Sequence, residues 1–320
     1  MVEQRPLGDS GYRISAIGLG SVNIAAPGWS GADEEAGYRL MDHALEQGIT
    51  FFDTAEEYAA GKSERVIGNW LRRTGCRDQI TLCTKVLDGA GDIHAALEAS
   101  LDRLGTDYVD VYLLHEFVPS PPLEEILAAL TEEVRAGRVR TIGCSNYTAA
   151  QLERALQISR SRCYEGYGFL QSEYSLVTAA DPRAHRPVGL AEMEDQLLPL
   201  AERERIAVAT YSPLGSGLLS GKYTDVQPLS PDADFDETPP VAYRFTERNL
   251  KIVESLRSLA QTRGIPMVRL AMAWAMTHPL VTSVLIGPRT TKQIDDAVAA
   301  HVMGLDPDLR AEMSAWARGS

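Results

Sequence analysis

The chain has 320 residues, of which 44% are hydrophobic and 23% are charged, a composition typical of ordinary globular proteins. Its formal net charge of −13 argues against nucleic acids and anionic membranes as main partners, because both attract basic surfaces. No segment approaches the roughly 18 consecutive apolar residues of a membrane span, and residues 1–11 contain no signal-peptide core. We therefore expect a cytoplasmic protein with one domain over residues 1–320, while its oligomeric state is left open.

Eight short apolar segments have the character of strands that are buried on both faces. They are Ile17–Gly20, Ile49–Asp53, Ile80–Lys85, Val109–His115, Val139–Ser145, Gly168–Gln171, Ile206–Tyr211 and Val281–Ile286. Amphipathic segments of helical period lie between several of them, as in Glu34–Gln47, Ile93–Leu104 and Leu123–Ala136. The first six strand ends follow one another at intervals of about thirty residues, the length of one βα unit.

This repeat predicts a (β/α)8 TIM barrel. The alternative is a doubly wound open sheet, which is disfavoured because Gly18-Leu19-Gly20 is not continued as Gly-x-Gly-x-x-Gly. Two short extended pieces within Arg5–Ile14 surround an Asp-Ser-Gly turn, which indicates an N-terminal hairpin that closes the bottom of the barrel. Two long connections, Ser172–Gly189 and Gly221–Ala242, follow strands and are expected on the C-terminal face, where barrel active sites lie.

The cysteines give no sign of a metal site. Cys76, Cys83, Cys144 and Cys163 form no Cys-x-x-Cys pair and have no His at zinc spacing. Two of them lie in expected strands, where a free thiol acts as a small apolar side chain. We expect all four to be structural and no metal to be bound.

Four ionisable groups lie at the ends of the second, third and fourth strands or just beyond them: Asp53, Tyr58, Lys85 and His115. Neighbouring strands of a barrel would bring them to one mouth, with Lys85 pointing inward beside Asp53. A structural ion pair explains those two alone, but a nearby ammonium would also lower the pKa of the Tyr58 phenol. The set then forms a proton-transfer site, in which His115 can hydrogen-bond the substrate oxygen.

These residues and several later motifs resemble the signatures of the aldo-keto reductases, in order over nearly the whole chain. The motifs are Asp53-Thr54-Ala55-x-x-Tyr58, Gly61-x-Ser63-Glu64, Lys85, His115, Gly143-x-Ser145-Asn146, Gln171, Tyr211–Gly217 with Leu218-Leu219-x-Gly221-Lys222, and Ile286-Gly287-x-Arg289. The resemblance implies a (β/α)8 barrel that binds a nicotinamide dinucleotide and reduces aldehydes or ketones, or oxidises alcohols or sugar lactols. It implies that Tyr58 is the general acid, that Lys85 and Asp53 tune it, and that His115 orients the carbonyl.

The resemblance also implies the residues that bind the cofactor. Ser145, Asn146 and Gln171 would hold the nicotinamide carboxamide, and Tyr211 would stack on the ring. A Gly-rich turn would approach the pyrophosphate, and Arg289 at a helix start would grip a ribose 2′-phosphate, which favours NADP(H) over NAD(H). The full set is Ser145, Asn146, Gln171, Tyr211, Ser212, Pro213, Leu214, Gly215, Ser216, Gly217, Lys222, Ile286, Gly287, Arg289, Gln293 and Asp296.

Some of these positions have simpler explanations or depart from the family pattern. Thr290-x-x-Gln293 and Thr148-x-x-Gln151 are capping boxes that need no ligand. Asp296-Ala297 stands where the family often has Glu-Asn, which weakens the expected binding of the adenine. Ala59 replaces the Gly that commonly follows the tyrosine, and the sequence alone indicates that this change is minor.

Two other functions remain open at this point. Relatives of this fold act as redox-sensing regulatory subunits of channels, with little turnover. A Schiff-base enzyme with Lys85 as nucleophile is a further alternative, but it leaves Tyr58 and Arg289 unexplained. The substrate is expected to be a small carbonyl or alcohol in a pocket lined by Trp29, Tyr58, His115, Phe117 and the two long loops.

Overall fold

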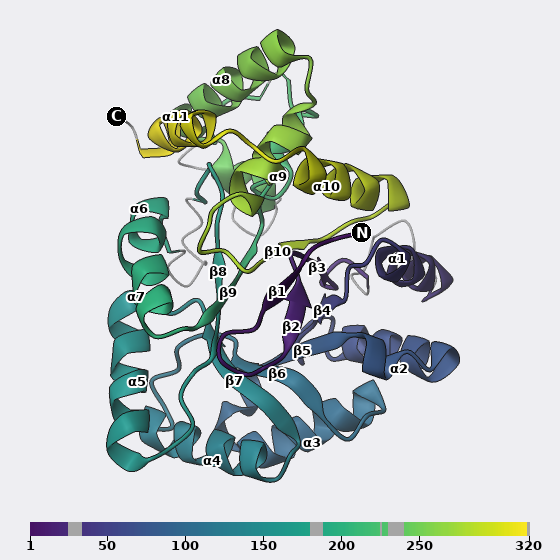
Figure 1. Ribbon diagram of the computed structural model, residues 1–320, viewed down its shortest axis with the longest axis vertical. Helices are drawn as coiled ribbons and strands as arrows, with labels where there is room; N and C mark the ends of the chain where they lie inside the picture. The colour runs from purple at the N-terminus through teal and green to yellow at the C-terminus, as the bar shows by residue number, and fades with distance from the viewer. Residues whose placement is uncertain (25–33, 180–187, 225, 230–239, 319–320) are drawn as a thin grey trace.

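A computed structural model describes residues 1–24, 34–179, 188–224, 226–229 and 240–318. Eight parallel strands form a closed barrel in the order β10-β3-β4-β5-β6-β7-β8-β9, with helices packed around it (Figure 1). The strand β10 closes the ring by pairing with β3, where Val284 lies opposite Ile17. The predicted (β/α)8 barrel is confirmed.

The barrel strands are short and almost wholly buried. They are β3 (Ile17–Gly20), β4 (Phe51–Asp53), β5 (Thr81–Val86), β6 (Val109–Leu114), β7 (Val139–Ser145), β8 (Phe169–Glu173), β9 (Ala207–Tyr211) and β10 (Ser283–Ile286). The expected strands agree with these to within two residues at each end. His115 lies one residue past β6, and β8 extends two residues beyond Gln171 to Glu173.

Helices surround the barrel, and several of them begin at a capping side chain. The helices are α1 (Glu34–Glu46), α2 (Lys62–Thr74), α3 (Ile93–Leu104), α4 (Leu123–Arg135), α5 (Ala149–Arg162), α6 (Leu190–Glu192) with a π-helical turn (Met193–Leu197) leading into α7 (Leu198–Arg203), α8 (Glu247–Arg263), α9 (Met267–Met276), α10 (Thr291–Met303) and α11 (Pro307–Arg318). Thr148 and Gln151 form a complete capping box at the start of α5, as the sequence predicted.

The N-terminal hairpin plugs one end of the barrel. The antiparallel pair β1 (Gln4–Pro6) and β2 (Arg13–Ser15) crosses the barrel opening in Figure 1. Leu7 and Ile14 are 1% and 0% exposed and belong to the apolar cluster inside the barrel, together with Phe51 and Phe169. The hairpin contributes these side chains at the N-terminal ends of the strands, which leaves the C-terminal ends as the open mouth.

Close strand contact makes one glycine near the mouth sensitive to substitution. A Cβ at Gly143, in β7, would overlap the carbonyl oxygen of Phe169 and lie 2.8 Å from a methyl group of Leu113. We expect Gly143→Ala to lower the free energy of unfolding by roughly 1–3 kcal/mol, as overpacking does. Urea denaturation measures the change. Gly166→Ala is the matched control, because a Cβ there meets nothing within 4 Å; equal stability of the two variants would contradict the prediction.

Candidate active site

The four predicted groups meet at the C-terminal mouth of the barrel. Lys85 Nζ lies 2.8 Å from Asp53 Oδ2 and donates a second hydrogen bond of 2.8 Å to the Thr54 carbonyl. It also lies 3.2 Å from the Tyr58 hydroxyl. Lys85 is fully buried and Asp53 is 2% exposed, so the ion pair is sealed from solvent. One ammonium therefore links the carboxylate and the phenol.

The Ser63-Glu64 motif anchors the loop that carries Tyr58. Ser63 Oγ accepts a 2.9 Å hydrogen bond from Thr54 and lies 2.6 Å from Ser21 Oγ. The buried Glu64 carboxylate accepts hydrogen bonds of 2.5 Å from both Thr84 and Arg103. This motif therefore anchors the loop rather than contacting the reacting groups.

Ala59 occupies a less favourable backbone conformation than the sequence suggested. Its φ is 51°, and Ala60 and Gly61 follow with φ of 53° and 75°. The left-handed region costs a residue with a Cβ about 1–2 kcal/mol. The replacement of the usual Gly by Ala59 is therefore a strained feature beside Tyr58 and not a minor change.

Burial decides the pKa of the tyrosine. It raises the pKa of Tyr58 to about 12, although Lys85 pulls that pKa down. The expected net lowering was wrong, because the sequence gives no measure of desolvation. Burial also acts to lower the pKa of Lys85, but Asp53 and Tyr58 outweigh it and the pKa is raised. The resting site thus holds a protonated phenol beside a charged ammonium.

His115 lies against the tyrosine as a neutral ring. The two ring centroids are 5.6 Å apart in an edge-on arrangement. Burial and the charge of Lys85 lower the pKa of His115 to about 3. Its Nδ1 lies 3.3 Å from Glu57 Oε1 without hydrogen-bonding geometry, and a neutral imidazole forms no ion pair there.

The predicted nicotinamide residues lie on the opposite side of the same mouth and are joined to the four groups. Gln171 donates a 2.8 Å hydrogen bond to Asp53 Oδ1, a link that sequence reasoning missed. Asn146 donates to the His115 carbonyl at 3.1 Å and accepts from the Tyr211 hydroxyl at 2.7 Å. The Ser145 hydroxyl is buried without a hydrogen-bond partner among the described residues. A buried hydroxyl of this kind is costly unless a ligand pairs with it, so these residues fit a nicotinamide carboxamide.

The Gly-rich turn follows β9 and is tightly folded. Ser212, Gly215, Ser216 and Gly217 all have φ between 52° and 92°. Pro213 and Gly215 are buried, Leu214 is half-buried and Ser216 is exposed. The Lys222 ammonium lies close to the turn, 3.2 Å from where a Cβ of Gly217 would stand. The turn and a cation therefore lie together, as the sequence predicted.

The segment after β10 is partly explained by helix capping. Thr290 accepts a hydrogen bond from the Gln293 amide at the start of α10, and the Gln293 side chain accepts 2.6 Å from the Arg289 amide. Gly287, next to Ile286, accepts from Asn23 at 3.1 Å. The Asp296 carboxylate is bound by Arg269 at 2.8 Å and by Lys292 at 2.7 Å. The Arg289 side chain is exposed, whereas Gln293 and Asp296 already have protein partners.

Of the two expected substrate residues, Phe117 is half-buried and lies edge-on to Tyr147, with ring centroids 5.5 Å apart. Trp29 falls outside the described residues.

In the described part of the chain, no group of three or more His, Cys, Asp or Glu side chains could hold a metal ion. Nor does any helix in these ranges have the length and apolar character of a membrane span.

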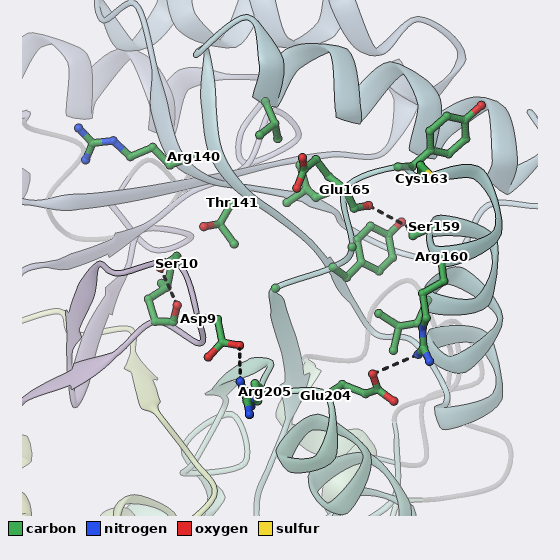
Figure 2. A pocket seen from close by; sticks show the side chains of 18 residues that line it. Asp9, Ser10, Arg140, Thr141, Ser159, Arg160, Cys163, Glu165, Glu204 and Arg205 are labelled. Atoms are coloured by element: carbon green, nitrogen blue, oxygen red, sulfur yellow. Dashed lines mark hydrogen bonds and ion pairs between the residues drawn. The ribbon is translucent and has the colours of Figure 1, made fainter.

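A cavity of about 450 Å³ lies at the other end of the barrel, below the starts of β7, β8 and β9 (Figure 2). Its charged side chains are largely paired with one another: Arg205 lies 3.2 Å from Asp9, and Arg160 lies 3.1 Å from Glu204. It contains none of the four mouth groups. We therefore place the chemistry at the mouth.

The fold and the mouth together define a TIM-barrel protein with a buried Asp-Lys pair joined to a tyrosine, a neutral histidine and a site that fits nicotinamide. The family model "Aldo/keto reductase family" matches residues 16–317, and the chain belongs to this family of nicotinamide-dependent carbonyl reductases. The expected resemblance is thereby confirmed.

Individual relatives cover almost the whole chain. It is 33% identical to an uncharacterized oxidoreductase of Bacillus subtilis (strain 168), YrpG, over 96% of this chain and 94% of that protein. It is 31% identical to a putative voltage-gated potassium channel subunit beta of Schizosaccharomyces pombe, over 92% and 87%. The crystal structure of the thermostable aldo-keto reductase Tm1743 with the inhibitor epalrestat covers 98% of this chain and 99% of its own, at a TM-score of 0.77 and 26% identity.

Proposed function

We propose that this protein interconverts an aldehyde or ketone, with sugars among the candidate substrates, and the corresponding alcohol with NADP(H), and that residues 1–320 act as one domain. The observation that supports this best is the position of Lys85 Nζ, within 3.2 Å of both Asp53 and the Tyr58 hydroxyl. The unpaired Ser145 hydroxyl across the mouth supports a nicotinamide site in register with it.

In the proposed reduction, the nicotinamide, when bound, supplies the hydride that the carbonyl carbon accepts. Tyr58 donates its proton to the carbonyl oxygen, and Lys85 stabilises the phenolate that remains. His115, neutral and edge-on to Tyr58, orients the carbonyl oxygen through a ring nitrogen. Asp53 and Gln171 keep Lys85 in place, so the developing charge meets groups that are already oriented.

Titration with NADPH and NADH, followed by a panel of aldehydes, ketones and sugars, tests this proposal. We expect NADPH to alter the fluorescence of the protein or of the nicotinamide, and at least one carbonyl to be reduced. If neither cofactor changed the fluorescence, the oxidoreductase proposal would be wrong.

A regulatory subunit with little turnover is the second candidate, favoured by the similarity to the putative channel subunit of S. pombe. It predicts NADPH binding without turnover of any carbonyl in the panel.

The Schiff-base alternative requires a neutral amine. Burial acts to lower the pKa of Lys85, but Asp53 and Tyr58 outweigh it and the pKa is raised. Borohydride trapping at Lys85 is therefore expected to yield no adduct.

The pH dependence should differ between the two directions. With a Tyr58 pKa of about 12, the phenol that reduction requires stays protonated across neutral pH. Alcohol oxidation requires the phenolate, so its rate should rise about tenfold per pH unit below that pKa. Since the pKa of His115 is about 3, kcat/KM for reduction should show no histidine inflection between about pH 5 and 8. Initial rates across pH measure both; an inflection near 6.5 that His115→Gln removes would contradict the prediction.

The lowered pKa of His115 also makes the stability of the folded protein depend on pH. The folded-state pKa of His115 lies below its ordinary value of about 6.5. The stability that the neutral ring contributes is therefore complete above that pH, and it is lost as the pH falls toward about 3.

Arg289 should decide between the two cofactors. Its exposed guanidinium at the start of α10 suits a ribose 2′-phosphate, and a charge-assisted hydrogen bond contributes roughly 1.5–3 kcal/mol. We expect Arg289→Gln to raise the Kd for NADPH about tenfold or more and to leave the Kd for NADH unchanged. Fluorescence titration measures both constants. Arg263→Gln, at the far end of α8, is the control; equal losses for NADPH and NADH in Arg289→Gln would refute this role.

A further inference from the structure

A buried ion pair that the mechanism does not use joins three segments behind the Gly-rich turn. Arg244, at the end of the 3-10 helix Pro240–Arg244, is 5% exposed, and Glu173 at the end of β8 is 9% exposed. The Arg244 Nη2 group bonds to the Glu173 carboxylate. The separation of 71 residues between the two hides this pair from any local sequence pattern.

The other guanidinium nitrogens bind the neighbouring segments. Nη1 donates to the Val177 carbonyl at 3.1 Å, on the loop after β8, and Nε donates to Ser216 Oγ at 3.3 Å, in the Gly-rich turn. The Asn249 amide donates to the carbonyls of Arg244 and Thr178, each at 2.8 Å. One planar side chain thus joins the end of β8, the loop behind it and the turn after β9.

The turn depends on external support for its shape. Ser212 and Ser216 have φ of 56° and 53°, a region that side chains with a Cβ avoid unless their surroundings hold them there. A Cβ at Gly215 would overlap Val177 and lie 3.4 Å from Arg244 Cδ. The turn is therefore pressed directly against the segment that Arg244 holds.

We infer that Arg244 is a positioning residue for dinucleotide binding: paired with Glu173, it holds the Ser212–Gly217 turn in the shape that receives the diphosphate. All three guanidinium nitrogens of Arg244 are engaged by Glu173, Val177 and Ser216, so Arg244 acts on the turn through Ser216 and the loop at Val177. This inference rests on the function proposed above. It predicts that the Arg244–Glu173 pair governs the affinity for the diphosphate half of the cofactor. The affinity for the nicotinamide half depends instead on Ser145, Gln171 and Tyr211.

Arg244→Lys tests the inference, because a lysine keeps the charge but cannot reach three segments at once. Binding of NADPH and of reduced nicotinamide riboside, which carries neither phosphate nor adenosine, is measured by fluorescence. We expect the Kd for NADPH to rise roughly tenfold, the size of one lost charge-assisted contact, and the Kd for the riboside to stay within about twofold.

Arg77→Lys is the matched control at the other end of the barrel. Arg77 also bonds a buried carboxylate, Asp110 at 2.9 Å, and the Tyr108 carbonyl at 3.0 Å. Its replacement should lower the thermal midpoint without changing the ratio of the two affinities. Should Arg244→Lys not fold, Ser216→Ala removes only the hydroxyl contact and is expected to weaken NADPH binding by about two- to threefold, without effect on the riboside.

The outcomes separate the inference from the proposed function. A folded Arg244→Lys protein that binds NADPH like the wild type, or loses affinity for NADPH and for the riboside in equal proportion, overturns the inference. Where Ser216→Ala replaces it, unchanged NADPH binding overturns the inference equally. If the wild-type protein binds neither NADPH nor NADH, both the proposed function and this inference are overturned.

Discussion

Tyr58→Phe is expected to lower the rate of carbonyl reduction by roughly 10²–10⁴-fold, the usual contribution of a positioned general acid. The substitution removes the hydroxyl that lies 3.2 Å from Lys85 Nζ and keeps the ring that packs edge-on to His115. The cofactor residues on β7, β8 and β9 are untouched, so the Kd for NADPH should stay within about twofold. Steady-state kinetics and fluorescence titration separate these two quantities.

Tyr164→Phe is the matched control, since Tyr164 lines the cavity at the opposite end of the barrel. It should leave both rate and affinity unchanged. Turnover by Tyr58→Phe at the wild-type rate would remove Tyr58 as the acid and leave the mouth without a proton donor of known position.

Lys85→Met should combine a loss of activity with a loss of stability. The charged Asp53 would remain buried without its ammonium partner, and breaking a buried pair in this way costs roughly 3–5 kcal/mol. Reduction should also fall, because Lys85 lowers the pKa of Tyr58 against the effect of burial, and its removal makes the phenol a weaker acid. Urea denaturation and initial rates measure the two effects.

The double variant Lys85→Met/Asp53→Asn distinguishes the two roles of the ammonium. Removing the unpaired carboxylate should restore much of the stability, while activity should stay low because the phenolate still lacks its cation. Recovery of turnover in the double variant would show that Lys85 serves only to neutralise Asp53. The folded-state pKa of Lys85 is raised, so the stability from its charge is complete below about pH 10 and is lost only above it.

The barrel could be predicted because its strands are apolar on both faces and recur at regular intervals. Alternation along Ile80–Lys85 correctly placed Cys83 inside the barrel and Lys85 at its mouth. The hairpin was likewise visible, since its Asp-Ser-Gly turn is a local signal. Helices α8 and α9 were not among the predicted helical segments, although the long connection was correctly expected to end before α8 begins at Glu247.

The convergence of Asp53, Tyr58 and Lys85 followed from strand order, but the energetics did not. The pKa of Tyr58 was predicted in the wrong direction because burial arises from the whole fold. Contacts across long separations were also hidden, as between Gln171 and Asp53 or between Arg244 and Glu173. Such pairs bring together segments whose own sequences carry no sign of the partner.

The hydrogen bond from Gln171 to Asp53 joins strands that stand four places apart in a ring of eight, so it crosses the full width of the mouth. The Asp53-Lys85 ion pair is therefore fixed by a hydrogen bond inside the barrel, whereas Tyr58, which Lys85 contacts, lies on the loop after β4. For protein engineering this separates two tasks: rim loops other than the one that carries Tyr58 can be exchanged to admit other substrates, while the hydrogen bond between Gln171 and Asp53 keeps Lys85 in place. It also means that the proton-donor side and the nicotinamide side must be redesigned as one unit.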